Sequence, residues 1–244
     1  MKKLFTTLSN IWKIQELKDR ILFTVMILLV YRFVSHLVLP GVDPTAFGEN
    51  EKSGILGLLD MFAGGSFSRV SILALGVMPY ISASIVVQLL GIAVPTFQKM
   101  QKEGESGRKK LNQITRYLTV AITIVQSVGY VKTQVPPEAI LPVMSSTMFY
   151  IVSTFVLTAG TLFVMWLGEK ITDKGIGNGT SLIIMVGIIA RLPQAISQEF
   201  SDKVGAASTG GGPVALVLEV VALFAIVMFT ILIVQGVRKV PVQY

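Results

Sequence analysis

The sequence predicts an all-α protein that crosses a membrane several times as a polytopic helix bundle. Hydrophobic residues make up 52% of the 244 residues, and charged residues make up only 14%. Soluble domains carry about 25% charged residues, and the mean hydropathy here is +0.69. Apolar runs of about 20 residues, the length that a helix needs to cross the hydrocarbon core, recur along the chain.

Six of these apolar runs are predicted to be membrane-spanning helices. They are residues 21–39, 72–94, 118–135, 147–168, 180–197 and 213–236. The fifth has the least regular pattern, because Arg191 and Pro193 lie near its end. The charged, amphipathic residues 1–20 are expected to lie at the membrane surface, and no small-residue cleavage site follows the first run. We therefore expect the first span to be retained.

The distribution of lysine and arginine predicts the side of the membrane that each loop faces. With a cytoplasmic N-terminus, 15 of the 21 basic residues fall in cytoplasmic segments, five fall on the opposite side, and Arg32 lies inside the first span. This bias follows the positive-inside rule, so both ends of the chain are expected to be cytoplasmic. The net charge of +7 is then mostly a consequence of topology. It also provides a surface for anionic lipid or an acidic partner, and it does not indicate nucleic-acid binding.

A short segment, residues 55–69, is apolar, interrupted by glycines and too short to cross a bilayer. Its ten or so apolar residues would reach about 15 Å as a helix, which is half of the hydrocarbon core. Two arrangements stay open: a re-entrant segment packed against protein or water, or a helix on the outer surface. The second span that follows contains Gly76, Pro79 and closely spaced small residues. We therefore expect a kinked helix beside a cavity.

Few groups inside the predicted spans could carry covalent or ion-coupled chemistry. The chain has no cysteine, which excludes disulfides and thiolate metal sites, and its one histidine is His36. Arg32 could snorkel or pair, and Glu219 falls in the first turns of the sixth span. The other polar groups are mostly hydroxyls, which commonly mediate helix packing in membranes. The pattern predicts no enzyme and no catalytic, metal or cofactor site, and it favours a passage or a packing scaffold.

Two predicted cytoplasmic loops are candidates for binding surfaces. The loop 168–181 has three alternating glycines before a helix, but the context of a nucleotide site is missing. We expect a tight turn there, capped by Thr180 or Ser181. The loop 95–117 mixes charges around two glycines, and it could be a solvated connector or a docking surface for a cytosolic factor.

Four stretches in order along the chain carry a family resemblance. They are residues 61–69 (MFAGGSFSR), 74–85 (ALGVMPYISASI), 102–110 (KEGESGRKK) and 165–179 (MWLGEKITDKGIGNG). They closely resemble the SecY family, the bacterial channel subunits of protein-translocation complexes. The resemblance implies a fold of ten spans in two pseudo-symmetric halves of five, of which this chain matches the first half and the sixth span.

This resemblance implies a division of the chain into four parts. Residues 1–20 would be a cytoplasmic amphipathic segment, and residues 21–197 a first half-channel with a re-entrant plug at 55–69. Residues 198–236 would supply an outer-side loop and the sixth span, and residues 237–244 the start of a cytoplasmic loop.

The resemblance also implies roles for individual residues. A plug that seals the outer funnel would involve Ile55, Leu58, Leu59, Met61, Phe62, Gly64, Gly65 and Arg69. A pore ring would use Val77, Ile81 and Ile184, with Thr180 at a position where the family often has an apolar residue. Such a narrow apolar neck tends to dewet and excludes ions.

Two further surfaces follow from the same resemblance. Polar contacts across a lateral gate would come from Gln88, Gln126 and Ser127. A cytoplasmic surface near the translocation partner would include Lys99, Lys102, Arg108, Lys109 and Lys110.

The implied function is a passive protein-conducting channel in the bacterial plasma (inner) membrane. It would pass secretory polypeptides across and release membrane-protein segments laterally into lipid. The implied partners are SecE and SecG-type small subunits, a SecA motor or a ribosome, substrate chains, the lipid bilayer and a C-terminal half with spans 7–10. A secondary transporter, which also uses broken helices, and a structural membrane scaffold are the alternatives. The scarcity of ionisable residues in spans two to five argues against the transporter, and the short segment argues against the scaffold.

Overall fold

A computed structural model of the chain describes residues 13–43, 55–142, 145–204 and 212–236. These residues form α-helices joined by turns, together with the short 3-10 helix η2 (Pro137–Ala139) and two isolated antiparallel bridges, Val38–Ser71 and Val42–Ile140. The predicted all-α class is confirmed. The chain divides into two compact units, Met1–Arg191 and Leu192–Tyr244.

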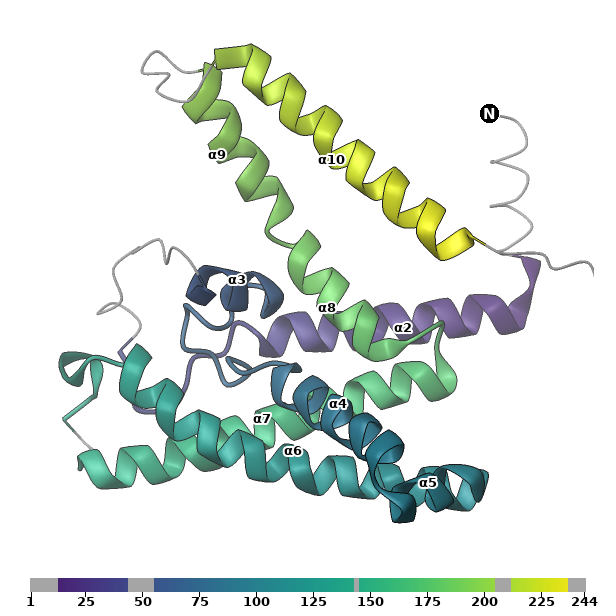
Figure 1. Cartoon of the computed structure of the whole chain (residues 1–244). Coiled ribbons are helices and arrows are strands. Elements are labelled where there is room, and N and C mark those ends of the chain that lie inside the picture. Colours follow the sequence, from purple (N-terminus) through teal and green to yellow (C-terminus); the bar gives the residue numbers. More distant parts are fainter. Residues whose placement is uncertain (1–12, 44–54, 143–144, 205–211, 237–244) are drawn as a thin grey trace, which may run out of the picture. The chain divides into compact units, whose positions relative to one another are not determined.

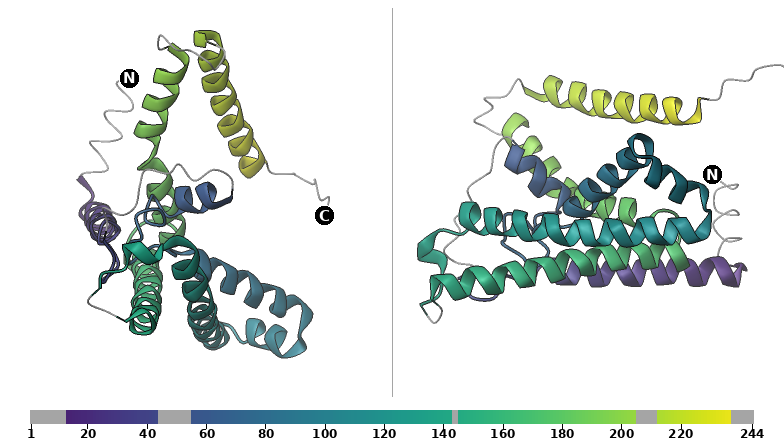
Figure 2. Two further views of the ribbon diagram at one scale, coloured as in Figure 1. Left: turned by 90° about the vertical axis from the view of Figure 1, so that its left-hand side faces the viewer. Right: turned by 60° about the horizontal axis from the view of Figure 1, so that its bottom comes forward.

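The first unit contains seven described α-helices (Figure 1). They are α2 (Gln15–Val34), α3 (Ile55–Phe62), α4 (Met78–Ala93), α5 (Pro95–Lys102), α6 (Glu105–Gln134), α7 (Ser146–Lys174) and α8 (Gly179–Ile189). Helix α7 packs against α2, α6 and α8, and α4 packs mainly against α6. Figure 2 shows the long helices α6 and α7 running alongside each other, with α2 next to α7.

Within the described residues, four helical stretches are long and apolar enough to cross a membrane. They are Glu105–Gln134, Ser146–Lys174, Gly179–Lys203 and Gly212–Gln235. The third, fourth and sixth predicted spans are therefore confirmed as helices. The fifth is interrupted, because turns at Ala190 and Arg191 separate α8 from the next helix. Helix α2, in the first predicted span, is long enough but less apolar than these four stretches, because charged residues at positions 16, 18, 19, 20 and 32 lie within it.

The N-terminal part of the second predicted span is not helical. Ser71 pairs with Val38 in an isolated bridge, residues 72–77 form turns, and α4 begins only at Met78. Pro79 therefore lies in the first turn of the helix, and the kink predicted from it is wrong. The fixed φ and missing N–H of proline suit a first helical turn, so Pro79 helps to start α4 rather than bend it.

The prediction of a loop at 95–117 is also wrong, because these residues form a helical hairpin. Helix α5 starts at Pro95 and is bent by 99° from α4. Gly104, whose φ of +72° favours glycine, then turns the chain into α6. The mixed charges of this region are thereby displayed on helices.

Two apolar clusters hold the first unit together, and the turns between α3 and α4 contribute to both. Phe67 lies in the first cluster with Phe149 and Leu157, whereas Leu73 lies in the second cluster with Tyr31. The turns that follow α3 are thus packed inside the helix bundle. This burial favours the re-entrant arrangement over a helix on the outer surface.

The second unit is a helical hairpin of α9 (Leu192–Val204) and α10 (Gly212–Gln235). The Lys203 side chain is 9% exposed, and its ammonium pairs with Glu199 at 3.0 Å and also with Glu219 on α10, which ties the two helices together. Helix α10 buries none of its residues, and its long apolar surface is suited to lipid or to other protein segments.

The predicted amphipathic segment 1–20 falls partly outside the described residues, which begin at Lys13. From Gln15 onward, its residues continue directly into α2.

Candidate functional site

The structure brings the three aliphatic residues predicted for the pore ring into one apolar cluster. Val77 is 5% exposed and directly precedes α4, while Ile81 lies in the first turns of that helix. Ile184 lies on α8, and it and Ile81 are half-buried against the cluster that also holds Ile183. The three side chains therefore share one apolar cluster, whose buried residues come from α2, the turns before α4, α7 and α8.

Thr180, the fourth predicted ring residue, packs toward α7. It is half-buried, and a Cβ added at Gly168 would lie 3.1 Å from its hydroxyl oxygen. The cap predicted at Thr180 or Ser181 is wrong, because Asn178 caps α8. The side-chain oxygen of Asn178 accepts a hydrogen bond from the Ser181 N–H at 3.2 Å. Asn178 has an extended backbone, which is typical of the residue that caps the N-terminus of a helix.

The segment predicted as a plug folds as α3 followed by a series of turns. Leu59 is half-buried, whereas Met61 and Phe62 are 44% and 41% exposed. Ile55 and Leu58 lie in α3, and the structure describes their backbone only. The buried pair Gly64 and Gly65 adopts φ values of +62° and +85°, a conformation that side chains disfavour.

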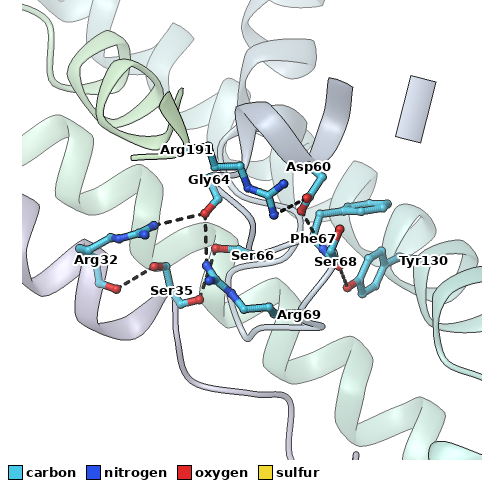
Figure 3. Close-up of polar contacts among 10 residues, drawn as sticks. All are labelled: Arg32, Ser35, Asp60, Gly64, Ser66, Phe67, Ser68, Arg69, Tyr130 and Arg191. Carbon is cyan, nitrogen blue, oxygen red and sulfur yellow. Dashed lines mark hydrogen bonds and ion pairs between the residues drawn. The ribbon is translucent and has the colours of Figure 1, made fainter. Parts of the chain in front are cut away.

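Neighbouring elements of the first unit hold these turns in place. The Tyr130 hydroxyl, from α6, donates to the Phe67 carbonyl at 2.7 Å (Figure 3). The rings of Tyr130 and Phe67 also pack edge to face, with their centroids 4.9 Å apart. The Val70 carbonyl accepts from the Leu39 N–H at 2.8 Å, after α2. On the α8 side, a Cβ at Gly64 would lie only 3.0 Å from the Gly187 Cα, so the two backbones are in close contact. Sequence reasoning missed Tyr130 and Gly187.

Replacing Tyr130 by phenylalanine is expected to loosen the turns without removing the ring contact. The change removes the shorter hydrogen bond to the Phe67 carbonyl and leaves the one from the Val70 N–H at 3.4 Å, and a hydrogen bond of this kind contributes about 0.5–1.5 kcal/mol. The midpoint of thermal unfolding, measured on the assembled protein in detergent, should fall. Tyr117→Phe is a suitable control, because Tyr117 is 73% exposed on the same helix. Equal shifts for the two variants would contradict this role of the Tyr130 hydroxyl.

Two of the predicted gate residues lie on exposed helix faces. Gln88 on α4 donates to the Ser84 hydroxyl at 3.2 Å, and Gln126 lies on α6. Gln126 and Ser82 border a cavity of about 310 Å³. The rest of its lining comes from segment 55–69, from the turns before α4, from the first residue of α4 and from α6: Leu59, Ala63, Phe67, Ala74, Leu75, Met78 and Tyr130.

Ser127, the third predicted gate residue, does not share this surface. It is buried and donates to the Ile124 carbonyl at 2.9 Å. Ser127 continues a line of buried hydroxyl residues spaced four apart on α6, Thr115, Thr119 and Thr123. Each threonine donates to the carbonyl four residues earlier, so this face packs with its polar groups satisfied inside the helix.

The five basic residues predicted for the cytoplasmic surface are all exposed. Lys99 and Lys102 lie on α5, and Arg108, Lys109 and Lys110 lie in the first turns of α6. Lys110 pairs with Glu103 at 3.4 Å. In the part of the chain that the structure describes, no group of three or more His, Cys, Asp or Glu side chains could hold a metal ion.

Comparisons with known proteins agree with these features. The sequence model of the SecY family matches residues 71–244. The chain is 41% identical to the protein translocase subunit SecY of Aquifex aeolicus, over 97% of this chain and 56% of that protein. It is 43% identical to SecY of Vibrio cholerae, over 95% of this chain and 52% of that protein. The chain thus spans about half the length of these curated relatives.

A solved structure supports the same fold. Sec61 in the canine ribosome–channel complex from the endoplasmic reticulum aligns with a TM-score of 0.51 at 17% identity, covering 93% of this chain and 49% of that one. At this identity the likeness concerns the arrangement of helices alone.

Proposed function

Because this chain belongs to the SecY family, we propose that it forms the first half and the sixth span of a protein-conducting channel subunit. The channel would pass secretory polypeptides across the bacterial plasma membrane and release apolar segments sideways into lipid. In this proposal, α3 and the following turns are the plug, while Val77, Ile81 and Ile184 form one arc of the seal. Gln88 and Gln126 would face the lateral gate.

The observation that carries this proposal is the contact between the short segment and the helices that hold the aliphatic ring. The turns after α3 are buried in the bundle and reach α8 through Gly64 and Gly187. Ile184 lies on the same helix, α8, three residues before Gly187. A plug and a ring that share one helix can respond to the same passing chain, which neither a transporter site nor a scaffold requires.

The proposed partners follow from the surfaces that this chain presents. The exposed basic residues of α5 and α6 would face the cytoplasm and a SecA motor or ribosome, and both chain ends would lie on that side. Spans 7–10, with SecE and SecG-type subunits, would complete the channel wall. Helix α10, none of whose residues is buried, provides apolar surface for such neighbours or for lipid.

Crosslinking of a trapped substrate tests the path through the ring. The chain has no native cysteine, so a cysteine at Ile81 gives a single reactive thiol. In a channel assembled with spans 7–10, SecE and SecA, we expect this thiol to crosslink a halted preprotein in an ATP-dependent way. The control is Phe155→Cys on α7, which is 74% exposed and lies outside both apolar clusters. Equal crosslinking from the two positions, or none from position 81, would contradict the proposed path.

A further inference from the structure

Two arginines from outside the plug segment reach the turn at the end of α3. Arg191, which follows α8, pairs with Asp60 at 2.6 Å between Nη2 and Oδ2. Arg32, on α2, donates to the Gly64 carbonyl at 3.2 Å. Figure 3 shows these side chains approaching the same turn, Arg32 from α2 and Arg191 from the turn after α8. The end of α3 is thus connected by charged groups to both α2 and the end of α8.

The Asp60 carboxylate is buried, and Asp60 also makes two local hydrogen bonds. Its side chain is 4% exposed. The Ser68 N–H donates to Oδ1 at 2.7 Å, and the Gly65 N–H donates to the Asp60 carbonyl at 2.9 Å. These local bonds lie inside the segment 55–69 and would move with it. The contact with Arg191 joins the segment to another element, so displacement of the segment must break it.

Positive charge exceeds negative charge around this turn, so removing the Asp60 carboxylate would do more than break one ion pair. Arg69 also donates to the Gly64 carbonyl at 3.2 Å, beside Arg32. A Cβ at Gly65 would lie 2.6 Å from one Arg191 nitrogen and 3.1 Å from Arg69 Nη2. Three guanidinium groups therefore surround one turn, with the Asp60 carboxylate among them. Loss of this carboxylate would leave like charges facing each other in a partly desolvated place.

We propose that Asp60 and Arg191 form an ion-pair latch that holds the plug segment against the end of α8. The close backbone contact between Gly64 and Gly187 lets the segment pack against α8. The ion pair adds a charged contact that breaks when the segment moves away. Arg191 is accordingly a positioning residue for the plug. This inference rests on the proposed channel function for its meaning, but the seating of α3 can be measured without transport.

The test uses a cysteine at Ala63, which is 5% exposed in the seated segment. The labelling rate with a membrane-impermeant maleimide is measured on the assembled channel in vesicles, with denatured protein giving the upper limit. Asp60→Asn keeps an acceptor for the Ser68 N–H but removes the charge, and Arg191→Gln removes the other partner. We expect each variant to raise the rate by roughly tenfold, since a pair with one buried partner lies between exposed and fully buried pairs in strength.

The double variant and two further variants make the test specific. Asp60→Asn combined with Arg191→Gln should label no faster than either single variant, because the two residues act through one contact. Arg191→Lys, which keeps a positive charge, should restore slow labelling. Arg116→Gln breaks another ion pair of the first unit, that with Glu169, and should leave the rate unchanged.

The outcomes separate the latch from the channel function. Unchanged labelling in both single variants, or additive effects in the double variant, would overturn the latch. An increase in Arg191→Lys equal to that in Arg191→Gln would also overturn it, because the effect would then follow from disturbed packing. If the assembled wild-type channel transports no preprotein, the proposed function fails, while the labelling series still decides whether the latch exists.

Discussion

Replacing Gly160 by alanine is expected to destabilise the first unit by about 3 kcal/mol, at the upper end of the usual effect of overpacking. Gly160 lies on α7, where a Cβ would sit 2.3 Å from the Ile72 carbonyl oxygen and 3.2 Å from its carbon. The obstacle is backbone, which cannot rotate away as a side chain can. Residues 71–77 would have to move off α7. Denaturant unfolding of the assembled protein, followed by circular dichroism, measures the loss.

Gly129, in the C-terminal part of α6, supplies the matched control. A Cβ at that position meets no atom within 4 Å. Alanine is favoured over glycine inside a helix by about 1 kcal/mol, so Gly129→Ala should leave stability unchanged or increase it. The two substitutions are chemically identical, but only Gly160→Ala is expected to lower the free energy of unfolding. A similar change in stability for both would show that the contact between Gly160 and Ile72 does not constrain the bundle.

The contact at Gly160 also determines where the proposed ring lies. Because Gly160 has no side chain, the turns of residues 72–77 can pack closely against α7. These turns contain Leu73 and Val77, which belong to the second apolar cluster. A displacement of these turns would therefore shift the ring as well as reduce stability. We expect Gly160→Ala channels that still assemble to conduct ions more readily than wild-type channels in the absence of substrate.

Much of the fold was predictable from the sequence because it depends on local pattern. Apolar runs of sufficient length predicted the helices α6, α7 and α10, since a helix in lipid must satisfy its own backbone. The short segment 55–69 was also recognisable, because its length excludes a span. The resemblance to SecY, carried by four stretches, pointed to Val77, Ile81 and Ile184, which the structure places in or against one apolar cluster.

The errors arose where one local signal allows two structures. Pro79 fits either a kink or a first helical turn, and only the packing of residues 71–77 on α7 selects the second. The charged hairpin of α5 and α6 was predicted as a loop, because mixed charges and glycines are typical of both. For Ser127 a signal was available: its spacing of four from Thr123 and Thr119 places it on the packed face of α6.

The contact between Asp60 and Arg191 could not be predicted from the sequence, because 131 positions separate its partners. Arg191 was interpreted only as an interruption of the fifth span. The available hint was Asp60 itself, an acid inside the apolar run of α3. A buried carboxylate requires a partner, but the sequence does not say which of the basic residues provides it.

Replacing Ile81 by asparagine is expected to raise the ion conductance of the resting channel. Ile81 is half-buried at the second apolar cluster, so a polar side chain there would offer water hydrogen bonds within the narrow apolar neck. A reduction of only about 1.4 kcal/mol in the barrier to ion entry would raise conductance roughly tenfold. Planar-bilayer recordings of the assembled channel without substrate would measure this change.

Ile85→Asn gives the corresponding control on the same helix. Ile85 lies one turn further along α4, is 51% exposed and belongs to neither apolar cluster. If the leak arises at the ring, Ile81→Asn should conduct and Ile85→Asn should remain closed. Equal conductance would mean that polarity anywhere on α4 disturbs the channel. Two closed variants would mean that the seal does not depend on Ile81, and the constriction would have to lie elsewhere.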